Sequence, residues 1–477
     1  MEAHAERRRC LFISLRITEQ IVNIDLVVDA ALVALGLVGT LGFVAFGWLS
    51  LREGVRRAAT IAASTGTTLA VLTFFSLKLP FPIKQNLVIM LVGAALLLAV
   101  LSFISIKPDS YLRSQRLGRF DERDVVFSRA RLQPGSQEYE QYYAMRPENL
   151  AIDEKFRALP GLLSLTARKA EPITFAAAEA SFDLTQAVRE AVDGVVASEK
   201  TPAGAEELTN MIKGLAQHLG AHNVGVTELK PAHVYSHIGR GTGLYGDPIV
   251  LDHHYAIAFS VEMDYVMMGR APEAPVVMES ARKYVDAAMI AIQLANLCRR
   301  LGYPARAHID GNYRVIAPLV ARDAGLGEIG RMGILMTPRL GPRVRLGIVT
   351  TDLPLLLDEP LSDSTMIHFC EICEKCAVNC PSKAIPFGDQ EGDKGQQRWK
   401  LNENKCFHYW NVIGTDCGLC MTVCPFSHPD QWAHNLVREV IRRSYLSHRA
   451  ALWFDDQFYG RKPVLRPLPA WLPPSSH

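Results

Sequence analysis

Eight of the ten cysteines in this 477-residue chain lie between residues 369 and 425, in two closely spaced runs. The first run reads C-x2-C-x2-C-x3-C-P, and the second ends in C-x2-C-x3-C-P. Short loops of this kind aim several thiolates at one point, as a 4Fe-4S cubane requires. The spacing therefore predicts two 4Fe-4S clusters, ligated by Cys370, Cys373, Cys376, Cys380, Cys406, Cys417, Cys420 and Cys424.

In two-cluster modules the fourth cysteine of each run ligates the other cluster. We therefore assign one cluster to Cys370, Cys373, Cys376 and Cys424, and the second to Cys406, Cys417, Cys420 and Cys380. Disulfides are disfavoured because a chain of this size needs no staples. Zinc is the remaining alternative, although zinc sites usually separate two C-x2-C pairs by a long loop. The insertion FHYWNVIGTD after Cys406 could cover a cluster or shape a cavity.

The composition excludes some classes of protein. A net charge of +2 without a dense basic run argues against a nucleic-acid partner. The two cysteines outside the runs, Cys10 and Cys298, form no disulfide framework, which indicates a reducing compartment. The length leaves room for two or three domains with a large core.

Three uncharged stretches, 30–50, 58–77 and 86–106, are each long enough to cross a bilayer as a helix. Buried helices of a water-soluble core are the alternative. We expect residues 1–110 to form a membrane anchor with three transmembrane helices. Residues 20–110 contain no histidine, so these helices cannot hold a haem through paired histidines.

The membrane orientation follows from the flanking charges. Arg7, Arg8 and Arg9 resemble a twin-arginine signal, but three successive spans favour an uncleaved anchor. The balance of Lys and Arg leans slightly towards a cytoplasmic carboxy-terminal part. Cluster insertion in the cytoplasm favours the same side, so we expect a multi-pass protein of the cell membrane with its soluble domain on the cytoplasmic face.

The soluble region mixes helix and strand patterns. Residues 111–230 read as a connector followed by helices, and residues 231–365 as an α+β or α/β core. Within this core we expect strands at 255–261, 313–317 and 344–350 and a long helix at 278–301. Residues 366–430 form the ferredoxin-like module, and residues 431–477 a C-terminal helix and tail.

A glycine-rich segment, 323–333, does not fit G-x-G-x-x-G after a strand, which argues against a dinucleotide site. Closely spaced glycines allow a backbone to approach a large ligand, with a tight structural loop as the alternative. The glycines concerned are Gly325, Gly327, Gly330 and Gly333.

Several motifs together resemble the corrinoid-dependent reductive dehalogenases, and also the related epoxyqueuosine reductases. They are HIGRGTGLYG (237–246), VEMDY (261–265), LGYPARAHIDGN (301–312), AGLGEIGRMG (324–333), GPRVRLGIVTTDLPL (341–355) and the two cysteine runs. The resemblance implies a nitroreductase-like core that binds cobalamin or a related corrinoid, with the four glycines and His308 at the cofactor site. No Asp-x-His-x-x-Gly signature is present, so we expect the corrinoid base-off, without a histidine ligand.

The resemblance also implies a tyrosine, a polar residue and an arginine around the substrate. The best matches are Tyr284, Asn312 and Arg345, and the competing positions are Tyr265, Tyr313 and Arg343. A tyrosine suits proton donation because its reference pKa of about 10 keeps it protonated at neutral pH, and an arginine stabilises the phenolate. Small residues on the stripe of Tyr284, namely Ala287, Ala288 and Ala291, would leave space beside a macrocycle.

The function expected from these features is reductive cleavage of a carbon–halogen bond in an organohalide. The chain contains no FMN or NAD domain, so the electron donor would be an external ferredoxin or reductase. Two alternatives stay open: an epoxyqueuosine-reductase-like corrinoid enzyme, and a membrane-tethered iron–sulfur electron-transfer protein without a substrate.

Overall fold

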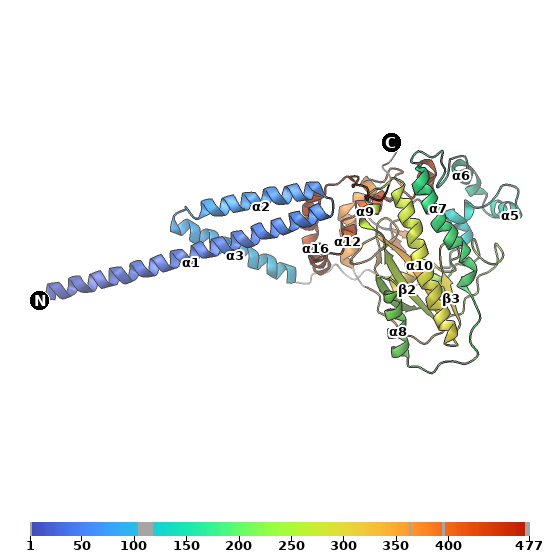
Figure 1. Ribbon diagram of the computed structural model, residues 1–477, viewed down its shortest axis with the longest axis horizontal. Coiled ribbons are helices and arrows are strands. Elements are labelled where there is room, and N and C mark those ends of the chain that lie inside the picture. Colours follow the sequence, from blue (N-terminus) through green and yellow to red (C-terminus); the bar gives the residue numbers. More distant parts are fainter. Residues whose placement is uncertain (1, 104–117, 362–363, 394–395, 473–477) are drawn as a thin grey trace. The chain divides into compact units, whose positions relative to one another are not determined.

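The computed structural model describes residues 2–103, 118–361, 364–393 and 396–472 (Figure 1). The chain divides into two units. The first contains the N-terminal helices together with Trp453–Gly460, and the second contains the rest of the chain.

Three long helices form most of the first unit: α1 (Glu2–Arg52), α2 (Arg56–Ser76) and α3 (Phe81–Phe103). Two segments, Ile24–Arg52 and Arg56–Ser76, are long and apolar enough to cross a membrane. They cover the first expected span, 30–50, and all but the last residue of the second, 58–77. The third expected span begins within α3, but residues 104–106 lie outside the described residues, so this span stays a prediction.

Small residues bring α1 and α2 together. A Cβ atom at Gly36 would collide with Thr73, and one at Gly39 would collide with Leu69. Close approach at glycine is typical of helices that pack within a membrane. Helix α3 is tied to α1 by charge, because Lys84 Nζ lies 2.7 Å from Asp25 Oδ1 and 2.6 Å from Asp29 Oδ1.

The core of the second unit is a four-stranded antiparallel sheet with the strand order β1-β2-β6-β3. Helix α10 (Pro275–Arg300) and α8 (Ala205–His218) pack on one face, and α11 (Ala317–Asp323) packs on the other. Figure 1 shows α10 running along the sheet beside β2 and β3. The strands are β1 (Asn223–Glu228), β2 (Tyr255–Glu262), β3 (Ala305–His308) and β6 (Val344–Thr351).

Alternate residues of β2 enter the two cores. Ile257 and Phe259 pack with α10, whereas Ala256 and Ala258 pack with α11. This period of two is expected of a strand buried on both faces. Opposite Phe259, strand β6 has Gly347, where a Cβ atom would collide with the phenylalanine ring. The mixed helix and sheet core thus follows the sequence pattern.

One expected strand is absent from the described core. In the segment 313–317 only Val315 forms an isolated bridge, with Val234. Helix α11 begins at Ala317 because Pro318 occupies its first turn, where proline is pre-organised for helix and lacks only an N–H that would be unpaired anyway.

The segment expected to be a surface connector is folded where the structure describes it, whereas residues 107–117 lie outside the described part. Its aromatic residues form two small cores, one of which joins Val126 and Phe156 to Phe407 of the cysteine module. Arg129 lies 3.3 Å from Asp153, and both side chains are buried. Its short helices are α4 (Val126–Arg129), α5 (Gln137–Met145) and α6 (Pro147–Arg157), followed by α7 (Pro172–Ala187).

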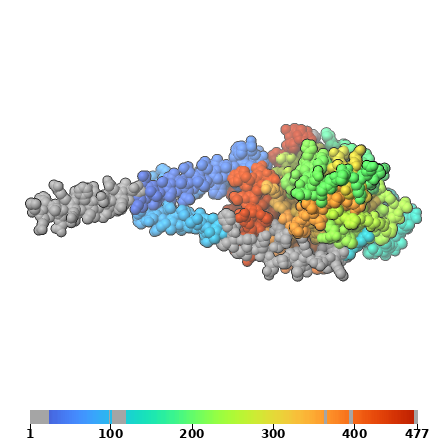
Figure 2. All heavy atoms as spheres, turned by 90° about the horizontal axis from the view of Figure 1, so that it is seen from below, coloured from blue at the N-terminus to red at the C-terminus, as the bar shows by residue number. Residues whose placement is uncertain are grey.

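The cysteine module consists of short helices and one hairpin. Its elements are α12 (Ser364–Cys373), α13 (Lys375–Val378), β7 (Glu391–Asp393), β8 (Gln396–Arg398), α14 (Glu403–Ile413) and α15 (Leu419–Thr422). Helix α16 (Trp432–Arg443) packs against α12, and α17 (His448–Phe458) follows. Figure 2 shows red atoms of the C-terminal part of the second unit beside the atoms of its orange segment. Arg438 of α16 is buried and donates to the carbonyl oxygens of Phe426 and Pro429, so it has a structural role.

Candidate active site

The eight cysteines of the two runs are free thiols. Four of them interact as one group: burial, followed by the neighbouring thiols Cys370 and Cys373, raises the pKa of Cys376. Burial and the same two thiols also raise the pKa of Cys424. These are the four cysteines assigned to the first cluster from their spacing, and that assignment stays a prediction.

The remaining four cysteines form a second group. Burial raises the pKa of Cys417 and of Cys420, and both thiols have Cys406 and Cys380 as charged neighbours. Cys420 also lies near Cys376 of the first group. Buried thiols with raised pKa values need a cationic partner to ionise, which is the chemistry that an iron–sulfur cluster supplies.

The loop at Cys417 is tightly wound. Cys417 has φ of 59° and Gly418 has φ of 72°, so two successive residues adopt the left-handed region. This conformation costs energy for a side chain with a Cβ atom, and the surrounding packing must support it. A Cβ atom at Gly418 would press on Val276 and Met268, which explains why glycine stands there.

The inserted segment after Cys406 belongs to α14, whose aromatic side chains face the connector. The rings of Phe407 and Trp410 lie 5.4 and 5.7 Å from the ring of Phe127. Phe127 lines the cavity described next. The insertion thus supports the wall of a cavity, one of the two roles expected for it.

A cavity of about 300 Å³ opens between β6, α10 and the segment after β3. This volume lies in the range of small-molecule sites. Its apolar wall includes Val125, Phe127, Val315, Leu335 and Leu346. Its polar groups are Tyr235, Arg240, Tyr284, Asp310, Tyr313 and Arg345. Two of the three predicted substrate residues, Tyr284 and Arg345, therefore meet in one cavity.

Tyr284 and Arg345 contact each other directly. The guanidinium carbon of Arg345 lies 4.9 Å from the centre of the Tyr284 ring. Burial raises the pKa of Tyr284, while the arginine opposes this shift. Tyr284 therefore carries its proton at neutral pH, next to a cation that would stabilise the phenolate left after proton transfer.

Arg345 is held by two side chains from different elements. Its Nη2 donates to Ser280 Oγ of α10 and lies 3.2 Å from Asp416 Oδ2, next to Cys417. The Ser280 hydroxyl in turn donates to Asp416 Oδ2. Burial raises the pKa of Asp416, and Arg345 opposes that shift.

Asn312 lies outside the cavity lining. It is fully buried, and its side-chain oxygen accepts a hydrogen bond from Arg306 Nη2 at 2.8 Å. Its amide nitrogen donates to the carbonyl oxygen of Arg189 at 3.0 Å. In the same motif, the polar residue that lines the cavity is Asp310, two positions before Asn312. The turn between them contains Gly311, which has φ of 71°.

Three polar residues of the cavity were not predicted from the sequence: Asp310, Tyr235 and Arg240. Arg240 lies 3.3 Å from Glu122 Oε1, a carboxylate supplied by the connector. Burial raises the pKa of Tyr235 to about 12. The signal for Asp310 was its place in the same motif as Asn312, but spacing alone does not say which of two residues flanking a glycine faces a cavity.

Of the three residues that compete with the predicted substrate residues, one lines the cavity and two do not. Tyr313 lines the cavity, and burial raises its pKa well above the ordinary value. Tyr265 lies elsewhere, with the guanidinium of Arg466 stacked 3.3 Å from its ring centre. Arg343 is buried and donates to the Ser427 carbonyl oxygen at 3.0 Å. Neither Tyr265 nor Arg343 lines the cavity.

The residues suggested for the cofactor site lie elsewhere in the fold. His308 is fully buried in β3; its Nδ1 accepts from the Arg314 N–H, and its Nε2 lies 3.0 Å from Thr350 Oγ1. Both ring nitrogens are thus engaged within the sheet. The expected space beside the alanine stripe is also absent, because Ala287 and Ala291 pack in the core against the sheet.

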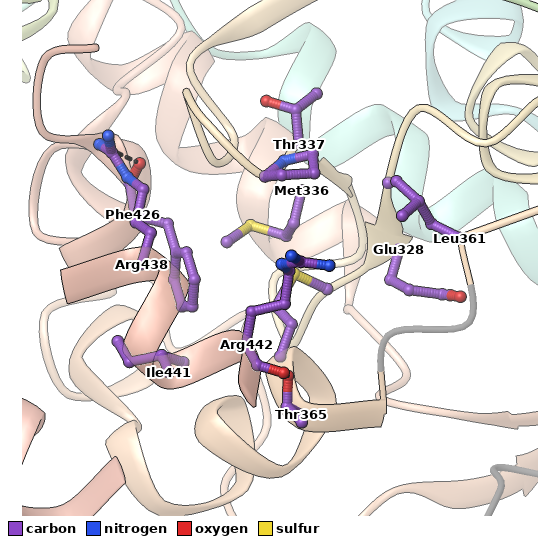
Figure 3. Close-up of a pocket in the computed structure, with 12 residues that line it drawn as sticks. Glu328, Met336, Thr337, Leu361, Thr365, Phe426, Arg438, Ile441 and Arg442 are labelled. Carbon is purple, nitrogen blue, oxygen red and sulfur yellow. Dashed lines mark hydrogen bonds between the residues drawn. The ribbon is translucent and has the colours of Figure 1, made fainter. Parts of the chain in front are cut away.

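The glycine segment packs against the cysteine module. A Cβ atom at Gly330 would approach Met336 and Cys370 Sγ, and one at Gly327 would collide with the backbone of Met336. The adjoining pocket, shown in Figure 3, lies between Met336 and Phe426 and measures about 20 Å³. Such a space holds about one water molecule. Close packing, the alternative considered for this segment, thus accounts for Gly327 and Gly330, and the role of the four glycines at a cofactor site stays a prediction.

The fold and the site together define a mixed helix and sheet protein that joins a ligand-sized cavity to a cysteine-rich iron–sulfur module. A family model described as "4Fe-4S dicluster domain" matches residues 369–428, which confirms the iron–sulfur module.

Known relatives include reductive dehalogenases. The chain is 34% identical over 291 residues to tetrachloroethene reductive dehalogenase of Sulfurospirillum multivorans, a match covering 54% of this chain and 58% of the relative. The tetrachloroethene reductive dehalogenase of Desulfitobacterium hafniense strain Y51 is 34% identical over 219 residues, which is 44% of this chain and 39% of the relative. These matches confirm the resemblance to reductive dehalogenases.

Solved structures agree with the sequence matches. The catabolic reductive dehalogenase NpRdhA in complex with 3-bromo-4-hydroxybenzoic acid is similar with a TM-score of 0.61 and 26% identity, over 76% of this chain and 49% of that one.

Epoxyqueuosine reductase of Pseudomonas aeruginosa is 24% identical over 315 residues, covering 56% of this chain and 82% of the relative. The chain spans about half the length of the dehalogenases that it matches.

Proposed function

We propose that the chain is a membrane-anchored reductive dehalogenase that removes a halide from an organohalide. The observation that carries this proposal is the single cavity in which Tyr284 and Arg345 meet, linked through Asp416 to the loop of a cluster cysteine. The similarity to reductive dehalogenases supports the same activity. An electron-transfer protein without a substrate would have no need of such a cavity.

The reaction requires two electrons and one proton, and it yields the hydrogenated product and a halide ion. Tyr284 would donate the proton from its hydroxyl to the carbon that loses the halogen. Arg345, 4.9 Å from the ring, would stabilise the resulting phenolate. Asp310 and Tyr313 would orient the substrate from the other side of the cavity. Phe127 and the apolar wall would exclude water around it.

The similarity to a reductive dehalogenase whose structure suggests B12-dependent dehalogenation supports a corrinoid cofactor. Tyr313 and Val315 line the first cavity, whereas Arg314 lines a second of about 600 Å³ with Ile238 and His253. We expect the corrinoid to bind next to these cavities, within a nitroreductase-like core. When bound, the corrinoid supplies a reduced cobalt centre for carbon–halogen cleavage. Both nitrogens of His308 are engaged, which supports base-off binding without that histidine.

The two groups of cysteines would hold two 4Fe-4S clusters with the membership inferred from the spacing. Electrons would arrive from an external ferredoxin or reductase. The N-terminal helices would anchor the chain in the cell membrane, with the second unit on the cytoplasmic face. A halogenated aromatic compound is the first substrate to test, because the structural relative was solved with 3-bromo-4-hydroxybenzoic acid.

The test is anaerobic expression of the full chain with a corrinoid supply, followed by iron and cobalt quantification. Halide release is then measured with reduced viologen against aryl and alkenyl halides. One corrinoid, about eight irons and halide release are expected. Eight irons without cobalt would favour the electron-transfer protein, and restored queuosine in a deletion strain would favour the epoxyqueuosine reductase.

A further inference from the structure

Three elements that are far apart in the sequence meet at the guanidinium of Arg345. Arg345 belongs to β6, Ser280 to the first turns of α10, and Asp416 to the loop that presents Cys417. Ser280 Oγ and Asp416 Oδ2 both contact Nη2 of the arginine and also contact each other. The three side chains thus form a closed triangle.

The triangle is buried but incompletely satisfied. The side chains of Arg345 and Asp416 are 18% and 9% exposed, and Ser280 is 1% exposed. Arg345 Nε and Asp416 Oδ1 are buried and have no hydrogen-bond partner among the described residues. An unpaired buried polar atom is unfavourable. Arg345 also lines the cavity, so the geometry at its guanidinium bears on the site as well as on packing.

The guanidinium of Arg345 lies over the ring of Tyr284. An unrestrained arginine side chain samples many rotamers, and the contact with the ring would be lost in most of them. Ser280 and Asp416 hold the Arg345 side chain in one rotamer. Asp416 directly precedes Cys417, so the same carboxylate connects the arginine to the loop of the second cysteine group.

We propose that Asp416 and Ser280 are positioning residues that hold Arg345 over Tyr284 and fix the loop of Cys417 to the substrate cavity. This inference rests on the proposed function. It identifies the group of Cys380, Cys406, Cys417 and Cys420 as the one whose loop is joined to the proton-donating tyrosine. A displacement of Arg345 by about 1 Å would be enough to lower the rate about a hundredfold.

The test compares Asp416→Ala, Asp416→Asn and Ser280→Ala in the full chain with its cofactors. The matched control is Thr185→Val, because the buried Thr185 hydroxyl of α7 donates to the Ser181 carbonyl oxygen at 3.1 Å and contacts neither the arginine nor the loop of Cys417. We expect kcat to fall about ten- to a hundredfold in Asp416→Ala and less in Asp416→Asn, which keeps an acceptor oxygen. The KM and the iron content should change little.

A second measurement does not depend on turnover. Phenylglyoxal labelling of Arg345, located by peptide mass mapping, should increase in Asp416→Ala and Ser280→Ala but not in Thr185→Val. If wild-type protein released no halide while this labelling pattern appeared, the proposed function would fail and the positioning role would stand. Equal labelling in all variants, or equal loss of kcat in Thr185→Val and Asp416→Ala, would overturn the inference.

Discussion

At the scale of single residues, the proposed chemistry depends on one buried phenol. Removing the Tyr284 hydroxyl in Tyr284→Phe keeps the ring under Arg345 and deletes the proposed proton donor. General acid catalysis contributes about 10²–10⁴-fold, so halide release with reduced viologen should fall by that factor. Iron and corrinoid contents should be unchanged, because the ring still fills its place.

Tyr265→Phe is the matched control for this substitution. Its ring stacks on Arg466 outside the cavity, so dehalogenation should stay within about twofold of wild type. If Tyr284→Phe kept full activity, the phenol would not be the proton donor, and Tyr313 in the same cavity would be the next residue to test.

The residue scale also shows where sequence reasoning stops. The cluster cysteines lie close together in the sequence, so their spacing alone indicates two groups. Tyr284 and Arg345 come from a helix and a strand 61 positions apart, and only the family motifs bring them together. Of the two polar residues that flank Gly311, Asp310 lines the cavity and Asn312 does not, because Gly311 turns the backbone between them. No periodicity predicts the side chain directions in such a turn.

At the scale of elements, an ion pair joins α11 to the turn that follows β1. Asp323 Oδ2 lies 3.0 Å from His233 Nε2 and 3.0 Å from Lys230 Nζ. Burial opposes the charge, but the hydrogen bond of His233 and the nearby Arg322 together hold the pKa of Asp323 well below its ordinary value. This contribution to stability is fully present above the unfolded pKa of about 3.9 and is lost as the pH falls through the folded value.

Asp323→Asn should therefore lower the free energy of unfolding at pH 7 by about 1.5–3 kcal/mol. The difference from wild type should shrink below about pH 4, where the wild-type carboxyl begins to take up its proton in the unfolded state. Urea unfolding of the anaerobic holoprotein, followed by circular dichroism at both pH values, measures this. Asp286→Asn, which removes the partly exposed partner of Lys283 on α10, is the control and should change little. A constant difference at both pH values would contradict this account.

A second prediction at the scale of elements concerns the cysteine module. Cys417→Ser should remove one cluster and leave the other, so the iron content falls from about eight to about four per chain. Cys298→Ser is the control, because Cys298 is a free thiol buried in the core on α10, away from both groups. Iron assays and electron paramagnetic resonance of the reduced protein distinguish the two. Loss of all iron in Cys417→Ser would show that the clusters do not assemble independently.

At the scale of the whole molecule, the first unit presents an apolar surface. Leu26, Val38, Leu41, Leu72 and Phe74 are each more than half exposed on α1 and α2. Exposed apolar surface of this extent marks a membrane or an interface. The full chain should stay in the membrane fraction after an alkaline carbonate wash and be released by detergent. Leu41→Arg, which puts a charge within the first span at a cost of about 3 kcal/mol, should weaken insertion, whereas Leu41→Ala should not.

The topology of the whole chain decides which electron donors can reach the clusters. An odd number of spans places the N-terminus and the second unit on opposite sides of the membrane, and the flanking charges favour a cytoplasmic second unit. A green fluorescent protein fused to the C-terminus should therefore fluoresce, and an alkaline phosphatase at the same place should be inactive. The reverse result would place the clusters outside the cytoplasm, where a soluble cytoplasmic ferredoxin could not be the donor. An even number of spans would move only the N-terminus, and an N-terminal reporter distinguishes that case.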